Sequence, residues 1–178
     1  MSLRPIVTLG DARLRRPGDR VRRFDKDLHR LLDEMVETMR AAPGVGIAAH
    51  QVGVPLQVCV IEAEGHLHEL VNPRLISTSG QQDDLEGCLS IPGFYAYRTR
   101  AAQAVMEAQD RRGRRIRLVG TGLLARAMQH EFDPLQGELY IALLGPDAKL
   151  NPTAELQAAD EAEADVGSAR DGALAAVE

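Results

Sequence analysis

The stretch TGLLARAMQHEFDP, residues 121–134, sets the expected architecture, because its apolar residues recur at helical spacing. Those residues are Leu123, Leu124, Ala127 and Met128. Pro134 lacks a backbone N–H, and its ring would clash with the carbonyl of residue 130, at a cost of about 3 kcal/mol in a helix interior. Asp133 precedes a proline and is therefore also pushed away from helical angles. We predict a helix over residues 121–133.

The segments before this helix carry strand and hairpin signals. Residues 102–109 and 114–119 flank a DRRG turn, which predicts a β-hairpin. Residues 56–61 predict a buried strand, and residues 69–73 and 74–76 predict two further short strands.

A second helix is predicted earlier in the chain, where Asp25 or Asp27 can cap it and Pro43-Gly44 ends it. Apolar residues recur in it at helical spacing, namely Leu28, Leu31, Leu32, Met35 and Met39. A helix, several strands and another helix indicate an α+β fold in one domain. We expect antiparallel strands packed around the central helix 121–133.

The net charge of −5 is unevenly distributed along the 178 residues. Residues 151–178 hold seven acidic side chains and one basic side chain, are rich in alanine and have no aromatic residue. We therefore predict a domain over residues 1–150 and a flexible acidic tail over residues 151–178. Because residues 1–150 are nearly neutral, bulk charge gives no support to nucleic-acid binding, and we expect no DNA partner.

The cellular location can be predicted from the hydropathy of the sequence and from its two cysteines. No apolar run approaches the length of a membrane span, and the N-terminus shows no secretory signal, so we expect no membrane association. Cys59 and Cys88 lie in different contexts and do not suggest a disulfide framework. The sequence therefore predicts a cytoplasmic protein.

Three segments carry chemically active side chains: residues 44–51 (GVGIAAHQ), residues 86–90 (EGCLS) and residues 129–133 (QHEFD). Each has an ordinary structural interpretation when it is taken alone. The first fits a tight turn, the second a buried small cysteine, and the third a surface pair on a helix. Their order and spacing change that interpretation.

Together the three segments resemble the signature of the bacterial peptide deformylase family, which is G-x-G-x-A-A-x-Q, then E-G-C-L-S, then H-E-x-D-H. The first two segments match at every specified position, and the third matches at four of five. The resemblance spans about residues 5–145 and includes Leu70–Pro73 and Ile91–Gly93. It implies a hydrolase of protein biosynthesis that removes the N-formyl group from formylmethionyl peptides of nascent proteins.

The resemblance also implies a metal-dependent site. The ion would be Fe²⁺ foremost, with Zn²⁺ or Ni²⁺ as substitutes, and Cys88 and His130 would be ligands. Three protein ligands and a water form an open catalytic site, at which the metal makes hydroxide available near neutral pH. Glu131 would be the general acid and base.

The remaining roles that the resemblance implies concern the substrate. The side-chain amide of Gln51 and the backbone N–H of Leu89 would hold the oxyanion that forms on the formyl group. The backbone of Val45 and Gly46 would pair with the substrate peptide as an added strand.

The third ligand of the family's motif is missing, because Pro134 stands where the second histidine is expected. Proline has no side-chain donor atom, so metal binding and activity would be impaired. Three explanations stay open. The chain is an inactive relative that binds N-blocked peptides, or an enzyme that recruits Asp133 or His50 as a ligand, or the product of a single-base change. Glu131 and Gln51 are intact, which favours retained function or recent loss.

Other polar clusters have simple interpretations. The run at residues 111–117 holds five arginines at the predicted hairpin turn, which favours a solvated turn, with ribosomal RNA contact as the alternative. The ribosome is a candidate transient partner, although the acidic tail argues against docking through a basic C-terminal extension. His66 and His68 are expected in a solvated hairpin.

Overall fold

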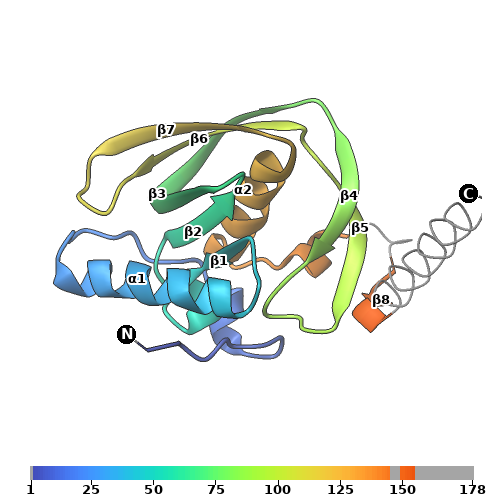
Figure 1. The fold of residues 1–178 in the computed structure, drawn as a ribbon, viewed down its shortest axis with the longest axis horizontal. Coiled ribbons are helices and arrows are strands. Elements are labelled where there is room, and N and C mark those ends of the chain that lie inside the picture. The colour runs from blue at the N-terminus through green and yellow to red at the C-terminus, as the bar shows by residue number, and fades with distance from the viewer. Residues whose placement is uncertain (1, 145–148, 155–178) are drawn as a thin grey trace, which may run out of the picture.

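The computed structural model describes residues 2–144 and 149–154 (Figure 1). In chain order its elements are the 3-10 helix η1 (Ala12–Arg15), α1 (Lys26–Ala41), β1 (Gly46–Ala48), the 3-10 helix η2 (Ala49–Val52), β2 (Val58–Ala63), β3 (His66–Ser79), β4 (Gln82–Gly87), β5 (Phe94–Arg100), β6 (Gln103–Gln109), β7 (Arg115–Thr121), α2 (Gly122–Leu135), the 3-10 helix η3 (Tyr140–Leu143) and β8 (Asn151–Pro152).

The strands form two antiparallel sheets. One has five strands in the order β1-β2-β3-β6-β7, and the other has three in the order β4-β5-β8. Figure 1 shows α2 at the centre, with the five-stranded sheet on one side and β4 and β5 on the other. The predicted α+β fold around a central helix is confirmed.

The two α-helices cover opposite faces of the five-stranded sheet. Because side chains alternate along a strand, Val58 and Val60 of β2 pack into the core beside α1. Cys59 and Ile61 point the other way, into the core beside α2. No helix in the described part of the chain is long and apolar enough to cross a membrane.

Strand β3 is one long strand where two short strands were predicted. Pro73 and Asn72 lie inside it, and Asn72 has a left-handed φ of 52°. Pairing with β6 shifts register between Val71 and Arg74, so a bulge accommodates the proline that cannot donate to the ladder. His66 follows the Glu64-Gly65 turn at the start of β3, and its side chain is exposed, whereas His68 is partly buried.

Helix α2 runs through Pro134 to Leu135, two residues further than predicted. The proline therefore falls in the last turn. There the chain closes the helix with hydrogen bonds from Gln136 N to Asp133 O (2.9 Å) and from Gly137 N to Pro134 O (3.0 Å). Gly137 takes a left-handed φ of 83°, as is common after a helix end.

The C-terminal boundary was predicted at residue 150. Asn151 and Pro152 pair with Tyr95 and Phe94 of β5, so strand pairing extends to Pro152. Thr153 follows with a hydrogen bond from its N–H to the carbonyl of Gly93 (3.0 Å), and residues 155–178 of the predicted acidic tail lie outside the described residues.

The cap of α1 can be tested by mutation. Asp25 accepts hydrogen bonds from the backbone N–H groups of Asp27 (3.1 Å) and Leu28 (3.3 Å). We expect Asp25→Ala to lower the free energy of unfolding by about 1 kcal/mol, measured by urea denaturation. Asp27→Ala is the control. Among the described residues the side chain of Asp27 pairs only with Arg30, at an exposed position, so this change should alter stability by less than about 0.5 kcal/mol. Equal effects would contradict the capping role.

Candidate active site

A cavity of about 600 Å³ lies between β1, β4 and α2. Most of its lining is apolar. Its polar lining residues include Gln51, Cys88, His130 and Glu131 from the three segments singled out in the sequence, together with Glu86, Arg126 and Thr153. Val45, Gly46 and Leu89 also line it. The structure thus brings together every side chain that was predicted to form the site.

Both polar atoms of the Gln51 side-chain amide, Oε1 and Nε2, have a partner. Its Oε1 accepts a hydrogen bond from the backbone N–H of Ala48 (2.7 Å), which orients Nε2 toward the Sγ of Cys88 (3.5 Å). Gln51 is buried, so this contact holds a donor beside the thiol.

Strand β1 presents a free edge to the cavity, because within the described part of the chain β2 is its only neighbour in the sheet. The carbonyl of Val45 accepts a hydrogen bond from the N–H of Glu62 on the β2 side (2.8 Å). Backbone groups of successive residues alternate in direction, so those of Gly46 face the free edge. Of the two residues expected to pair with a peptide, Val45 and Gly46, only Gly46 has its backbone groups directed toward this edge.

Glu86 also lines the cavity, and its buried carboxylate accepts four hydrogen bonds. Arg100 donates two of them, from Nε to Oε1 (2.7 Å) and from Nη2 to Oε2 (2.8 Å). Arg126 donates from Nη1 (3.1 Å), and His130 Nδ1 lies 3.0 Å from Oε2. Burial by itself would raise the pKa of Glu86, but the hydrogen bonds and charges of Arg100 and His130 hold it well below its ordinary value of 4.5.

This network determines the orientation of His130. Because ionised Glu86 can only accept, Nδ1 of His130 donates to it, which leaves Nε2 for a partner on the cavity side. The ring also packs beside that of Tyr140, with centroids 5.7 Å apart. Burial opposes a charge on the ring, yet hydrogen bonds to Cys88 and Glu86 raise the pKa of His130 to about 10.

Glu131 is buried against β1. A Cβ atom added to Gly46 would lie 2.6 Å from Oε1 of Glu131, so only glycine leaves room for this carboxylate. Burial, reinforced by the charges of Asp133 and Glu86, raises the pKa of Glu131 to about 7. A carboxyl group with such a pKa can take up and release a proton near neutral pH.

The backbone N–H of Leu89 is the second candidate donor beside Cys88. Strand β4 ends at Gly87, and the following turn is closed by the N–H of Ile91, which donates to the carbonyl of Cys88 (2.8 Å). Among the described residues, no hydrogen-bond acceptor contacts the N–H of Leu89. It is therefore available to a ligand in the cavity.

A metal ion fits this site only in part. Cys88 and His130 are suitable donors, but within residues 2–144 and 149–154 no group of three His, Cys, Asp or Glu side chains could hold an ion. Asp133 is engaged by Arg100 (2.8 Å) and Arg98 (3.2 Å). His50 is fully buried and does not line the cavity. Neither residue proposed from the sequence replaces the missing ligand.

Sequence reasoning missed the groups that support the site. Glu86 belongs to the quoted EGCLS segment, and this position was the available signal, but no role was assigned to it. Arg100, Arg126 and Tyr140 are far from Glu86 in the chain and carry no local pattern. Their function emerges only when β5, α2 and η3 come together.

Comparisons with known proteins agree with this geometry. A sequence model of the family described as polypeptide deformylase matches residues 3–149. The peptide deformylase of Acidothermus cellulolyticus is 46% identical over 149 residues, which are 84% of this chain and 83% of that protein. The crystal structure of a peptide deformylase from Legionella pneumophila is 40% identical, with a TM-score of 0.79 over 82% of this chain and 88% of that one. A peptide deformylase from Synechococcus elongatus in complex with actinonin is also 40% identical, with a TM-score of 0.77 over 80% and 79% of the two chains.

The Glu86 network predicts a large stability effect. Glu86→Gln leaves Arg100 and Arg126 buried without their shared carboxylate, so we expect the free energy of unfolding to fall by about 3 kcal/mol at neutral pH in urea denaturation. Glu62→Gln is the matched control, because Glu62 pairs with Arg40 at the surface and should contribute at most about 1 kcal/mol.

The difference in stability between wild type and Glu86→Gln should also depend on pH. The folded-state pKa of Glu86 is depressed, so its stabilisation is complete above its ordinary value of 4.5 and is lost as the pH falls toward the folded-state pKa. The stability gap between wild type and Glu86→Gln should therefore be constant near neutrality and should narrow below about pH 4.5. A gap that widens in acid would refute this assignment.

Proposed function

Because the chain belongs to the peptide deformylase family, we propose that its cavity binds formylmethionyl peptides of nascent proteins and removes their N-formyl group. The observation that carries the proposal is the convergence of Gln51, Cys88, His130 and Glu131 on one cavity beside a free strand edge. Fold, cavity and side chains all fit hydrolysis of an amide bond.

The peptide would bind as an added strand at the edge of β1. The backbone groups of Gly46 face that edge and can pair with the main chain of an extended peptide. The apolar lining suits a methionine side chain, and Val45 contributes its side chain to it, together with Leu85, Ile91 and Phe94. This mode selects an N-terminal residue by its shape and apolar character.

The polar groups would then stabilise the negative charge on the formyl oxygen and carry the proton from the water to the amine. The N–H of Leu89 and the Nε2 of Gln51 donate to the oxygen that becomes negative when water attacks the formyl carbon. Glu131 takes the proton of the attacking water and passes it to the departing amine, as its pKa of about 7 allows. The C–N bond breaks, and formate and a free N-terminus result.

Peptide deformylases are metalloenzymes, and here Cys88 and His130 would hold the ion. Fe²⁺ is the first candidate, with Zn²⁺ and Ni²⁺ as substitutes. When bound, the ion supplies hydroxide near neutral pH. We propose that Pro134 replaces a third metal ligand. Loss of a residue that merely supports a ligand lowers metal affinity by about 10–100-fold, and loss of the ligand itself should lower it further. Both cysteines are free thiols, and the required thiolate suits a cytoplasmic location.

A second candidate function is binding without hydrolysis. The incomplete donor set favours it, because the peptide edge and the apolar cavity do not depend on the metal. The chain would then bind N-blocked peptides as an inactive member of the family. Metal content of protein purified anaerobically separates the two: near-stoichiometric metal supports the enzyme, and an empty site supports the binding protein.

The role of position 134 can be tested by restoring a ligand. We expect Pro134→His to raise metal content and formyl-peptide hydrolysis together, because it supplies an imidazole four residues after His130, on the same helix face. Pro134→Ala is the matched control. It removes the same ring without adding a donor, so it should alter thermal stability but leave metal content and turnover unchanged.

The result that would overturn this account is equally clear. If the unmodified protein is fully metallated and hydrolyses formyl-Met peptides as fast as Pro134→His, another ligand completes the site. Gain of activity in Pro134→Ala would also contradict it, since the defect would then lie in helix strain and not in a missing donor.

Glu131 can be tested in the Pro134→His protein. We expect Glu131→Gln to lower turnover by at least about 10²-fold while metal content stays unchanged, because the amide fills the same space but cannot take up a proton. Turnover would be followed by formate release. Retained turnover in this variant would exclude Glu131 as the general base.

A further inference from the structure

A second hollow of about 370 Å³ lies on the α1 side of the five-stranded sheet, and its lining shares no residue with the cavity that holds Cys88. Its lining includes four arginines: Arg20, Arg74, Arg115 and Arg117. Glu107 is the one acidic residue in the lining. The formal charge of these lining residues is therefore +3, although residues 1–150 as a whole are nearly neutral.

Strand register places three of these arginines on one face. Arg74 of β3 lies opposite Glu107 of β6, and Glu107 lies opposite Arg117 of β7, so the three form a row across the sheet. Arg115 lies two residues before Arg117 and therefore shares its face. The intervening Ile116 packs toward α2 on the other side.

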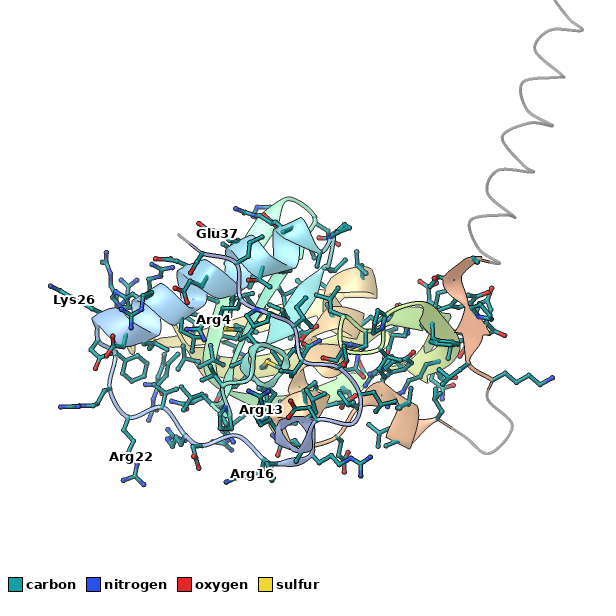
Figure 2. All side chains as sticks on the ribbon, turned by 90° about the horizontal axis from the view of Figure 1, so that it is seen from below. Arg4, Arg13, Arg16, Arg22, Lys26 and Glu37 are labelled. Atoms are coloured by element: carbon teal, nitrogen blue, oxygen red, sulfur yellow. The ribbon has the colours of Figure 1, made fainter. Side chains whose placement is uncertain are left out.

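The fourth arginine is brought in by the N-terminal segment. Asn72 accepts a hydrogen bond from the N–H of Val21 (2.8 Å) and donates to the carbonyl of Val21 (3.0 Å) and to Gln109 (2.8 Å). These bonds fasten the segment that carries Arg20 against β3 and β6. Figure 2 shows Arg16 and Arg22 of the same segment projecting outward from it.

The arginines of this hollow are weakly neutralised. Within residues 2–144 and 149–154, Arg20, Arg74 and Arg115 form no ion pair, and Arg117 has only a 3.8 Å contact with Glu107. By contrast, the arginines at both ends of the nearby turn are paired, Arg111 with Asp33 and Glu69, and Arg114 with Asp110. Of the five arginines at residues 111–117, Arg111 and Arg114 are therefore neutralised at the turn, whereas Arg115 and Arg117, which lie on the sheet face, keep most of their charge unpaired.

We infer that this face, called the arginine face and made of Arg20, Arg74, Arg115 and Arg117, binds the phosphate backbone of RNA. Guanidinium groups match phosphate oxygens in geometry and charge. Adjacent strands lie about 4.8 Å apart, so the backbones of Arg74 and Arg117 are separated by roughly 10 Å, which suits successive phosphates better than one isolated phosphate. The choice of RNA rests on the proposed function, since nascent chains are presented by the RNA-rich ribosome.

The test is binding of a fluorescein-labelled RNA hairpin to the whole protein, followed by anisotropy between about 50 and 200 mM salt. We expect Arg74→Ala/Arg115→Ala to weaken binding at least about tenfold at low salt and to reduce the slope of log K against log salt by about 2. Arg13→Ala/Arg40→Ala is the matched control. It changes the net charge equally, on η1 and α1, and should weaken binding by less than about twofold.

The inference would be overturned by no RNA binding at low salt, by equal weakening in the two double variants, or by preference for phosphatidylserine vesicles over the hairpin. Competition by inorganic phosphate at concentrations near that of the RNA would also overturn it, because a single-phosphate site would then suffice. No turnover is measured in this test, so failure of RNA binding and failure of deformylation are separate results. Both double variants should keep the wild-type melting temperature within a few degrees, which checks that the fold is intact.

Discussion

The buried carboxylate of Glu86 connects the three-stranded sheet with α2 and, through α2, with the five-stranded sheet. It belongs to β4, and it accepts from Arg100 of β5 and from Arg126 and His130 of α2. Four donors satisfy its acceptor sites, so its charge is tolerated in a place where an unpaired carboxylate would not be. Since α2 packs on the five-stranded sheet, this network also joins the three-stranded sheet to it.

Two side chains of the cavity are oriented by hydrogen bonds from behind. Glu86 orients His130 through Nδ1, and Ala48 orients Gln51 through Oε1. Neither contact involves Pro134, which lies in the last turn of α2, beyond both groups. Neither support therefore depends on the side chain at position 134.

Local patterns in the sequence predicted local structure well. The cap at Asp25, the helix after it and the β6–β7 hairpin are all present, because each depends on residues that are close in the chain. The convergence of the three segments on one cavity followed from a resemblance and not from periodicity. Long-range features were not predictable in this way: the partners of Glu86, the continuation of β3 past Pro73 and the pairing of β8 with β5 all depend on contacts between distant segments.

The buried carboxyl group of Glu131 differs from that of Glu86 in its hydrogen-bond partners. Its carboxyl group is buried, Oε2 has no hydrogen-bond partner among the described residues, and burial raises its pKa to about 7. A carboxyl group in that position lowers the stability of the fold when it is ionised, whereas Glu86, equally buried, is fully paired. Gly46 must also remain a glycine to make room for it. Burial without a partner for Oε2 therefore opposes ionisation of Glu131, and this is the physical cause of its raised pKa.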